Sequence, residues 1–159
     1  MRNRNIVTVS VSLGFALLWT LSGCAAPKPA PVPPAATVEV ARPSNPGGPG
    51  PAATLVGDVQ NGAQIFATNC VACHGAEGKG GVNNPGSKDG TVPPLNPIDD
   101  TLKSADPKVF TYNIDLFIEH GSTPEGSNPT LKMLSWGDQK TLTPQQIADV
   151  IAYVISLNK

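Results

Sequence analysis

Apolar residues recur at helical spacing in three segments after residue 57. The first segment follows Asp58, a residue type that caps helix N-termini, and runs into Cys70. The apolar positions that mark it are Val59, Ala63, Phe66 and Ala67. Gly62 interrupts the segment, although glycine costs a helix about 1 kcal/mol relative to alanine. We therefore predict a helix over 58–70 in which Gly62 lies at a close contact with another helix.

The second helical pattern runs from about Asp106 to Glu119. Pro107 suits the first helical position, and Gly121 suits the cap beyond the C-terminus. One face of this segment is apolar, at Phe110, Ile114, Phe117 and Ile118. This spacing predicts a helix that buries one face against the rest of the domain.

The last helix has the strongest start signal. Thr143 can cap it, Pro144 fits its first position, and Gln146 completes a capping-box pattern. Its apolar stripe consists of Ile147, Val150, Ile151, Val154 and Ile155. Residues 75–100 are rich in Gly, Asn and Pro instead and predict a long loop, which is uncommon unless functional. Because no alternating strand pattern of useful length follows residue 57, the predicted class is all-α with long loops.

The N-terminal pattern is that of an exported protein. Arg2 and Arg4 precede an uncharged apolar run over residues 6–22, as in a secretory leader. The run ends in Leu-Ser-Gly-Cys24, which resembles the lipobox of bacterial lipoproteins and implies that Cys24 is acylated after cleavage. Two acyl chains anchor a protein stably. The alternative is an uncleaved signal anchor, and both predict a domain held at the membrane on the periplasmic, extracytoplasmic side.

A Pro/Gly-rich segment follows the leader. Residues 25–57 contain nine Pro and four Gly and show no helical or strand periodicity. Such a composition favours extended polyproline conformations, and at ~3.1 Å per residue the segment would reach on the order of 100 Å. The predicted organisation is therefore a signal peptide over 1–23, a lipid-anchored tether over 24–57 and a folded domain over 58–159.

Composition limits the kind of core and the kind of partner. The chain has 159 residues, of which 5% are aromatic, and Gly and Pro together number 33. The core of the folded part is therefore small. The formal net charge is −1, which is not the balance of a nucleic-acid-binding protein. We expect no nucleic-acid partner.

Residues 70–74 carry the most specific chemical pattern. They read Cys70-Val-Ala-Cys73-His74, the attachment pattern of a c-type haem. Two thiols at this spacing can each form a thioether with one porphyrin, and the following residue places an imidazole under the iron. The alternatives are a thioredoxin-like redox pair, which would need a βαβ setting, and half of a zinc site, which would need two more ligands. One covalent haem c is the predicted cofactor.

A six-coordinate haem c needs a second axial ligand, usually Met or His. Beyond the leader the chain has one Met, Met133, and one further His, His120. Met133 lies in a predicted loop that can reach the iron from the face opposite His74. His120 ends a predicted helix, where a charged imidazole is also favourable. The residues therefore favour Met133 and leave His120 and an open axial position as alternatives.

Over residues 58–159 the sequence resembles class I cytochromes c of the small bacterial type. The segments that carry the resemblance are 62–66, 70–75, 93–95, 118–121, 133–137 and 142–154. One departure is Leu134, where many relatives have Pro after the ligand Met. With the lipobox, the chain is also similar to the lipid-anchored monohaem subunit of alternative complex III, a quinol oxidoreductase.

The resemblance implies a set of site residues. Cys70 and Cys73 carry the thioethers, and His74 and Met133 ligate the iron. The Pro93 carbonyl accepts the proximal imidazole proton, with Pro94 as the nearby alternative. Trp136 belongs to the same cofactor-binding set. The first and last helices are implied to cross at Gly62, near Tyr153.

We expect one-electron transfer rather than catalysis, because two axial ligands leave no open position for a small-molecule substrate. Membrane-bound redox partners in a respiratory or photosynthetic chain are the expected partners. The carrier is either a tethered shuttle or a fixed subunit of a quinol-oxidising complex. The alternatives are a gas-sensing or ligand-binding haem protein and the haem subunit of a dehydrogenase. Lys79, Lys88, Lys132 and Lys140 are candidates for the rim of the electron port, or ordinary solvated charges.

Overall fold

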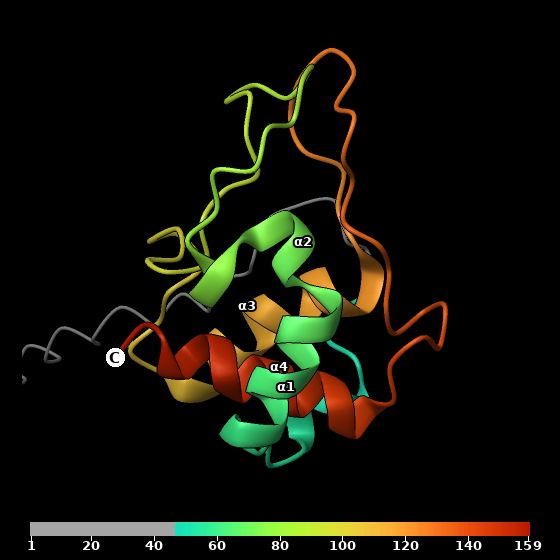
Figure 1. Ribbon diagram of the computed structural model, residues 1–159. Helices are drawn as coiled ribbons and strands as arrows, with labels where there is room; N and C mark the ends of the chain where they lie inside the picture. The colour runs from blue at the N-terminus through green and yellow to red at the C-terminus, as the bar shows by residue number, and fades with distance from the viewer. Residues whose placement is uncertain (1–46) are drawn as a thin grey trace, which may run out of the picture. The chain divides into compact units, whose positions relative to one another are not determined.

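The computed structural model describes residues 47–159, and this part of the chain is helical (Figure 1). Three isolated β-bridges occur in it and no strand does. The all-α prediction is confirmed. The elements in chain order are η1 (Pro51–Thr54), α1 (Val59–Asn69), α2 (Val71–His74), η2 (Ala76–Gly78), α3 (Pro107–His120) and α4 (Pro144–Ser156).

The predicted caps start the three long helices. The side chains of Asp58 and Asp106 accept hydrogen bonds from backbone N–H groups in the first turns of α1 and α3. Thr143 and Gln146 form the predicted capping box of α4. The short helix α2 was not predicted, since the sequence pattern continued the first helix into Cys70. In the structure Cys70 ends α1 and begins α2.

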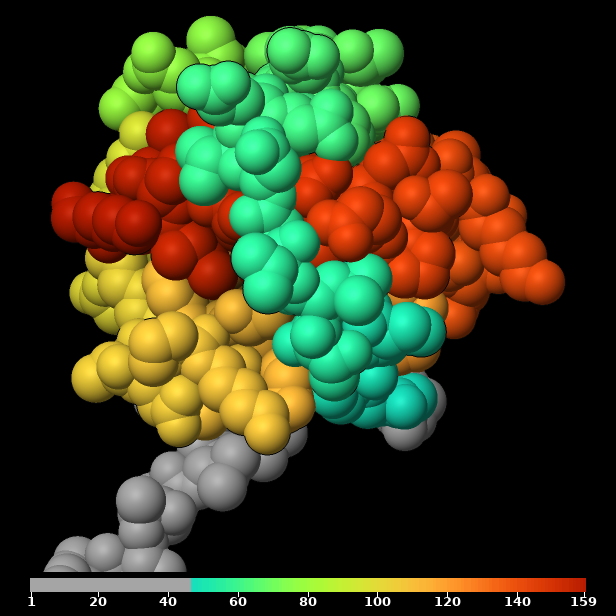
Figure 2. Space-filling view, turned by 90° about the horizontal axis from the view of Figure 1, so that it is seen from below, coloured from blue at the N-terminus to red at the C-terminus, as the bar shows by residue number. Residues whose placement is uncertain are grey.

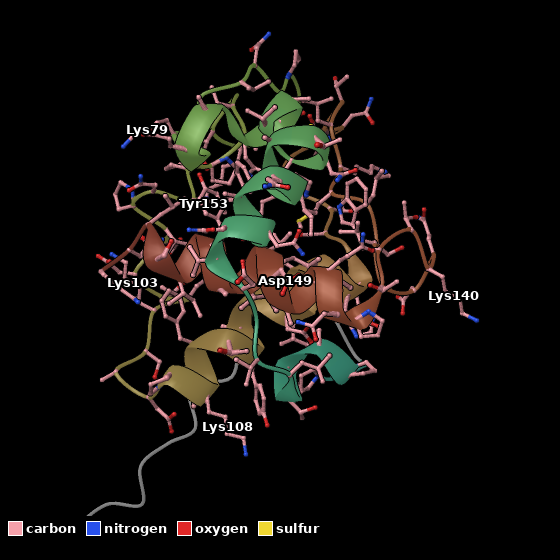
Figure 3. The ribbon with its side chains drawn as sticks, turned by 60° about the horizontal axis from the view of Figure 1, so that its bottom comes forward. Lys79, Lys103, Lys108, Lys140, Asp149 and Tyr153 are labelled. Carbon is pink, nitrogen blue, oxygen red and sulfur yellow. The ribbon has the colours of Figure 1, made fainter. Side chains whose placement is uncertain are left out.

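Helices α1 and α4 cross at Gly62, as predicted. A Cβ atom at Gly62 would lie 1.9 Å from the backbone oxygen of Asp149 and 3.0 Å from Cβ of Tyr153. Figure 3 shows Asp149 and Tyr153 on α4 where α1 passes over it. One turn further along α1, the Phe66 ring lies 5.2 Å from the Tyr153 ring, centroid to centroid. Only a residue without a side chain permits this approach.

The segment just before α1 packs on the domain. Ala52 is fully buried in the hydrophobic core, and the backbone N–H of Gly50 donates to the carboxylate of Asp115. Figure 2 shows this segment (teal) lying across α3 and α4. Residues 47–57 were expected to belong to the tether because they are rich in Pro and Gly. That composition gives no sign that one alanine is buried or that a short 3-10 helix forms. The packed part of the chain therefore begins before residue 58.

The N-terminal predictions concern residues outside the described part of the chain. These are the leader over 1–23, the acylated Cys24 and the tether up to residue 46. They stay predictions. Within residues 47–159 the helices are too short or too polar to cross a membrane.

Candidate functional site

The Cys-x-x-Cys-His pattern forms the joint between α1 and α2. The backbone N–H of Cys70 donates to Phe66 at the end of α1, and that of His74 donates to Cys70 across α2, at 2.8 and 2.9 Å. Residues three apart on a helical turn lie on the same face. Both thiols are therefore presented to one side, with His74 in the next position.

The two cysteines are free thiols and both are half-buried. Burial, and next the neighbouring Cys73, raise the pKa of Cys70 to about 11. A redox-active pair needs the opposite, a thiolate stabilised near neutral pH. The environment of Cys70 therefore disfavours the thioredoxin-like alternative.

His74 has a neutral imidazole. Burial lowers its pKa, and the Pro93 carbonyl opposes that shift. Its Nδ1 atom is buried and makes no hydrogen bond of normal geometry, and the Pro93 carbonyl is the backbone acceptor that acts on the ring. A neutral imidazole is the form that binds metals, and a ligating histidine usually gives its other ring proton to such a carbonyl. An Nδ1 proton directed at the Pro93 carbonyl leaves Nε2 as the ring nitrogen that would bind a metal.

A glycine brings the proline pair next to His74. The backbone N–H of Gly80 donates to the His74 carbonyl at 2.7 Å. Gly80 has φ +69°, and a Cβ there would lie 2.6 Å from the Pro94 nitrogen. Sequence analysis missed Gly80, because it is one of many glycines in this loop and no spacing rule singles it out.

The loop that carries Met133 is paired with the end of α3. Ser122 and Met133 exchange two backbone hydrogen bonds, of 3.1 and 2.9 Å. Gly121, with φ +70°, turns the chain between α3 and this pair, and a Cβ there would lie 2.5 Å from the Met133 carbonyl oxygen. The side chain of Met133 is partly buried against the core, whereas the next one, Leu134, is 54% exposed.

The structure places Cys70, Met133 and Trp136 against one hydrophobic cluster. The backbone N–H of Trp136 donates to Ile118 of α3 at 2.9 Å. His120 is placed differently, because both its ring nitrogens already have partners, in the Asp138 carboxylate and the Gly48 carbonyl. The His120 ring nitrogens are thus already engaged, whereas none of the hydrogen bonds described within residues 47–159 involves the Met133 side chain.

Asn84 joins the two long loops that extend beyond the helices in Figure 1. It is fully buried, and its amide donates to the Leu131 carbonyl and accepts from the Leu131 N–H, at 3.1 and 2.7 Å. The loop after α2 is therefore tied to the loop that leads to Met133. Sequence analysis missed this residue, since a single Asn in a polar loop gives no signal of burial.

The lysines do not form one group. Figure 3 shows Lys79 and Lys140 on opposite sides of the domain. Lys88 forms an exposed ion pair with Glu125, at 3.0 Å. Lys79 and Lys140 therefore do not belong to one cluster of charges.

The residues fit a covalent haem. They supply two thiols on one helical turn, a neutral half-buried imidazole beside them, and a thioether on a loop packed against the hydrophobic core. The zinc alternative fits less well, since residues 47–159 contain no cluster of three or more His, Cys, Asp and Glu placed to hold a metal ion. A haem with thioether and imidazole ligation would use the same kinds of donor.

Comparison with known proteins assigns the family. Residues 59–158 match the family model described as "Cytochrome c". Among curated proteins, the chain is 32% identical over 101 residues to the "Cbb3-type cytochrome c oxidase subunit FixP" of Sinorhizobium medicae, covering 64% of this chain and 30% of that protein. It is 33% identical over 102 residues to "Cytochrome c6" of a Nostoc species, covering 64% of this chain and 72% of that protein.

The chain thus spans less than a third of the length of the FixP relatives that it matches. No solved structure matches it significantly. The family model covers well over half of the chain, and its residues include every described site residue. The chain therefore belongs to the cytochrome c family, whose members bind haem c covalently and carry electrons.

Proposed function

We propose that this chain is a one-electron carrier with a single haem c, attached at Cys70 and Cys73 and ligated by His74 and Met133. The observation that carries the proposal is the Cys70–His74 turn, with its paired half-buried thiols and a neutral imidazole whose buried Nδ1 atom is within reach of the Pro93 carbonyl. Family membership supports it independently. Bound haem supplies the ferric–ferrous couple.

The chain's own groups set how that couple behaves. Cys70 and Cys73 hold the group at two points of one helical turn, which fixes its orientation to α2. With haem bound, the Pro93 carbonyl would accept the Nδ1 proton of His74, which would orient the ring and raise its basicity as a ligand. Met133 and the hydrophobic cluster behind it favour a higher potential than two imidazoles in a polar site would.

The same ligation makes the chain a carrier rather than an enzyme. If His74 and Met133 both ligate the iron, they would leave it no open position for a small-molecule substrate. We expect no catalytic residue. Electrons leave and enter by contact with redox partner proteins.

The carrier is proposed to act at the extracytoplasmic face of a membrane, held by a lipid at Cys24. The leader, lipobox and Pro/Gly-rich segment support this part of the proposal. The relatives support two modes: one is named as an oxidase subunit, and the other, cytochrome c6, matches over most of its length. A haem-stained native gel of gently solubilised membranes separates them. A haem band within a large assembly means a fixed subunit, and a small lipidated species means a shuttle.

Replacement of the second ligand tests the site. We expect Met133→Ala to lower the midpoint potential by on the order of 100 mV, a fraction of the about 0.8 V that axial ligands cover. Leu134→Ala is the matched control, because that side chain is adjacent but mostly exposed, and its potential should stay at the wild-type value. Redox titration of the purified holoproteins measures both. Equal potentials in Met133→Ala and wild type would remove Met133 from the iron.

A further inference from the structure

His120 joins three parts of the domain at one point. It is the last residue of α3, and its side chain is 19% exposed. Its Nε2 atom lies 2.8 Å from the carbonyl oxygen of Gly48, in the segment before η1. Its Nδ1 atom lies 2.9 Å from a carboxylate oxygen of Asp138, in the loop that follows Met133.

Both partners of His120 are acceptors. A carbonyl and a carboxylate each need an N–H from the ring, and a neutral imidazole has only one. The two contacts are therefore complete only when the ring carries both protons. The end of α3 also favours a cation, because the last carbonyls of a helix carry partial negative charge. The geometry thus calls for an imidazolium.

The contact continues to Met133 through the backbone. Ser122 pairs with Met133, the Trp136 N–H donates to Ile118, and the Asp138 N–H donates to Glu119 at 3.0 Å. These bonds fasten the loop over 133–138 along the end of α3. The last contact in this series is the one between the His120 side chain and the Asp138 carboxylate.

The segment before η1 fits closely against this end of α3. A Cβ atom at Gly47 would lie 2.5 Å from Cε1 of His120, and one at Gly50 would lie 2.5 Å from the Glu119 carboxylate carbon. The N–H of Gly50 also donates to the buried Asp115 carboxylate. Residues 47–50 are therefore packed closely against the end of α3.

We infer that His120, as an imidazolium, is a positioning residue that clasps residues 47–50 and the loop over 133–138 to the end of α3 and so holds Met133 in place. The inference rests on the proposed ligation by Met133. It gives His120, the other ligand candidate from the sequence, a role that acts on the iron through another residue. It also gives residues 47–50 a role other than that of a spacer.

The inference has a definite pH dependence. The hydrogen bond to Asp138, followed by that to the Gly48 carbonyl, raises the pKa of His120, and the nearby Glu119 adds to the shift. Burial raises the pKa of Asp115, the remaining carboxyl at this end of α3, to about 6. Since the folded pKa of His120 is raised, the clasp is complete below the ordinary histidine value of about 6.5 and is lost as the pH rises through the raised value.

The test uses ferric holoproteins of the wild type, Asp138→Asn and His120→Gln. The absorption band of thioether–iron ligation is followed against pH, and the ring protons of His120 are titrated by NMR. Asp138→Asn keeps an acceptor of similar shape but removes its charge, so both the His120 titration and the loss of the band should move to lower pH. The His120→Gln variant lacks the titrating ring, so it should lose the band independently of any His120 titration. Asp100→Asn, an exposed carboxylate paired with Lys103, is the control and should match wild type.

Two results would overturn the inference. The first is that the wild type shows the band and that Asp138→Asn and His120→Gln both lose it at the same pH as the wild type. The other is an unshifted His120 titration in Asp138→Asn, which counts against the clasp even if the wild type shows no band at any pH. A wild type without the band means instead that Met133 is not the ligand, which is a failure of the proposed function.

Discussion

At the scale of single residues, the site consists of a specific motif and of less conspicuous supports. The Cys70–His74 pattern predicts the thioether cysteines and the first ligand, and the scarcity of Met and His favours Met133 as the second; this donor set stays a prediction. The supports were not predictable: Gly80, Gly121 and Asn84 act through close backbone approach or burial. Glycine and asparagine are common in loops for several reasons, so their identity alone does not show which one meets another segment.

Asn84 gives a prediction at this scale. Asn84→Ala removes two hydrogen bonds and leaves the Leu131 N–H and carbonyl without partners, which should cost about 1–3 kcal/mol of unfolding free energy. The Leu131 amide should also exchange with solvent faster. Denaturant titration and hydrogen exchange of the holoprotein measure these effects. Asn83→Ala, at the exposed neighbouring position, should change neither, and equal losses in the two variants would contradict the account.

At the scale of elements, capping signals and apolar stripes predicted the long helices well. Asp58, Asp106 and Thr143 each cap the helix that they were expected to start. The break at Cys70 was not predictable, because α2 continues the helical pattern with only four residues. Local propensity is weak over so short a segment, and the fold around it decides the conformation.

The crossing of α1 and α4 gives the second prediction. Gly62→Ala puts a methyl group 1.9 Å from a backbone oxygen of α4, so the helices must separate. Overpacking of a core costs about 1–3 kcal/mol, and contact with backbone places this variant at or above the upper end. Gly81→Ala is a control without a steric neighbour, although its positive φ adds some strain. Thermal unfolding of the holoproteins compares them, and a Gly62→Ala midpoint at or above that of the control would contradict the crossing.

A buried carboxylate fastens the same helices. Asp149 of α4 accepts hydrogen bonds from the backbone N–H of Asp58 and the side chains of Asn61 and Gln145. Burial acts to raise the pKa of Asp149, but these three hydrogen bonds outweigh burial and lower it. Because the folded pKa is depressed, the stabilisation is present above the unfolded value of about 3.9 and is lost as the pH falls through the folded value.

Asp149→Asn should therefore destabilise the domain by about 1–3 kcal/mol at pH 7, because an amide cannot accept all three bonds. The difference from wild type should shrink only at pH values below about 3.9. Denaturant titrations at pH 7 and pH 3 measure it. A difference that is the same at both pH values would mean that the charge of Asp149 is not what the hydrogen bonds stabilise.

At the scale of the whole molecule, the folded domain is longer than the sequence indicated. Residues 47–57 pack on α3 and α4, since Ala52 enters the core and Gly47 to Gly50 fit against the end of α3. Composition described this segment correctly as rich in Pro and Gly, but composition does not show whether such a segment finds a surface to lie on. The packed residues cannot serve as a spacer.

The proposed anchor gives the prediction for the whole chain. Wild-type cells grown with a labelled fatty acid should incorporate the label into the haem-stained protein, and cells with Cys24→Ser should not. The haem stain itself should be unchanged, because Cys24 is not part of the haem motif. Label in neither protein would support the uncleaved signal anchor instead of the lipoprotein.

The central claim is that this cytochrome c holds its iron between His74 and Met133 and therefore carries electrons without binding a substrate. The most direct measurement is the absorption spectrum of the ferrous wild-type holoprotein at neutral pH, before and after addition of carbon monoxide. The account predicts an unchanged spectrum, because both axial positions are filled. Ready formation of a carbon monoxide complex would contradict it and would identify a ligand-binding haem protein instead.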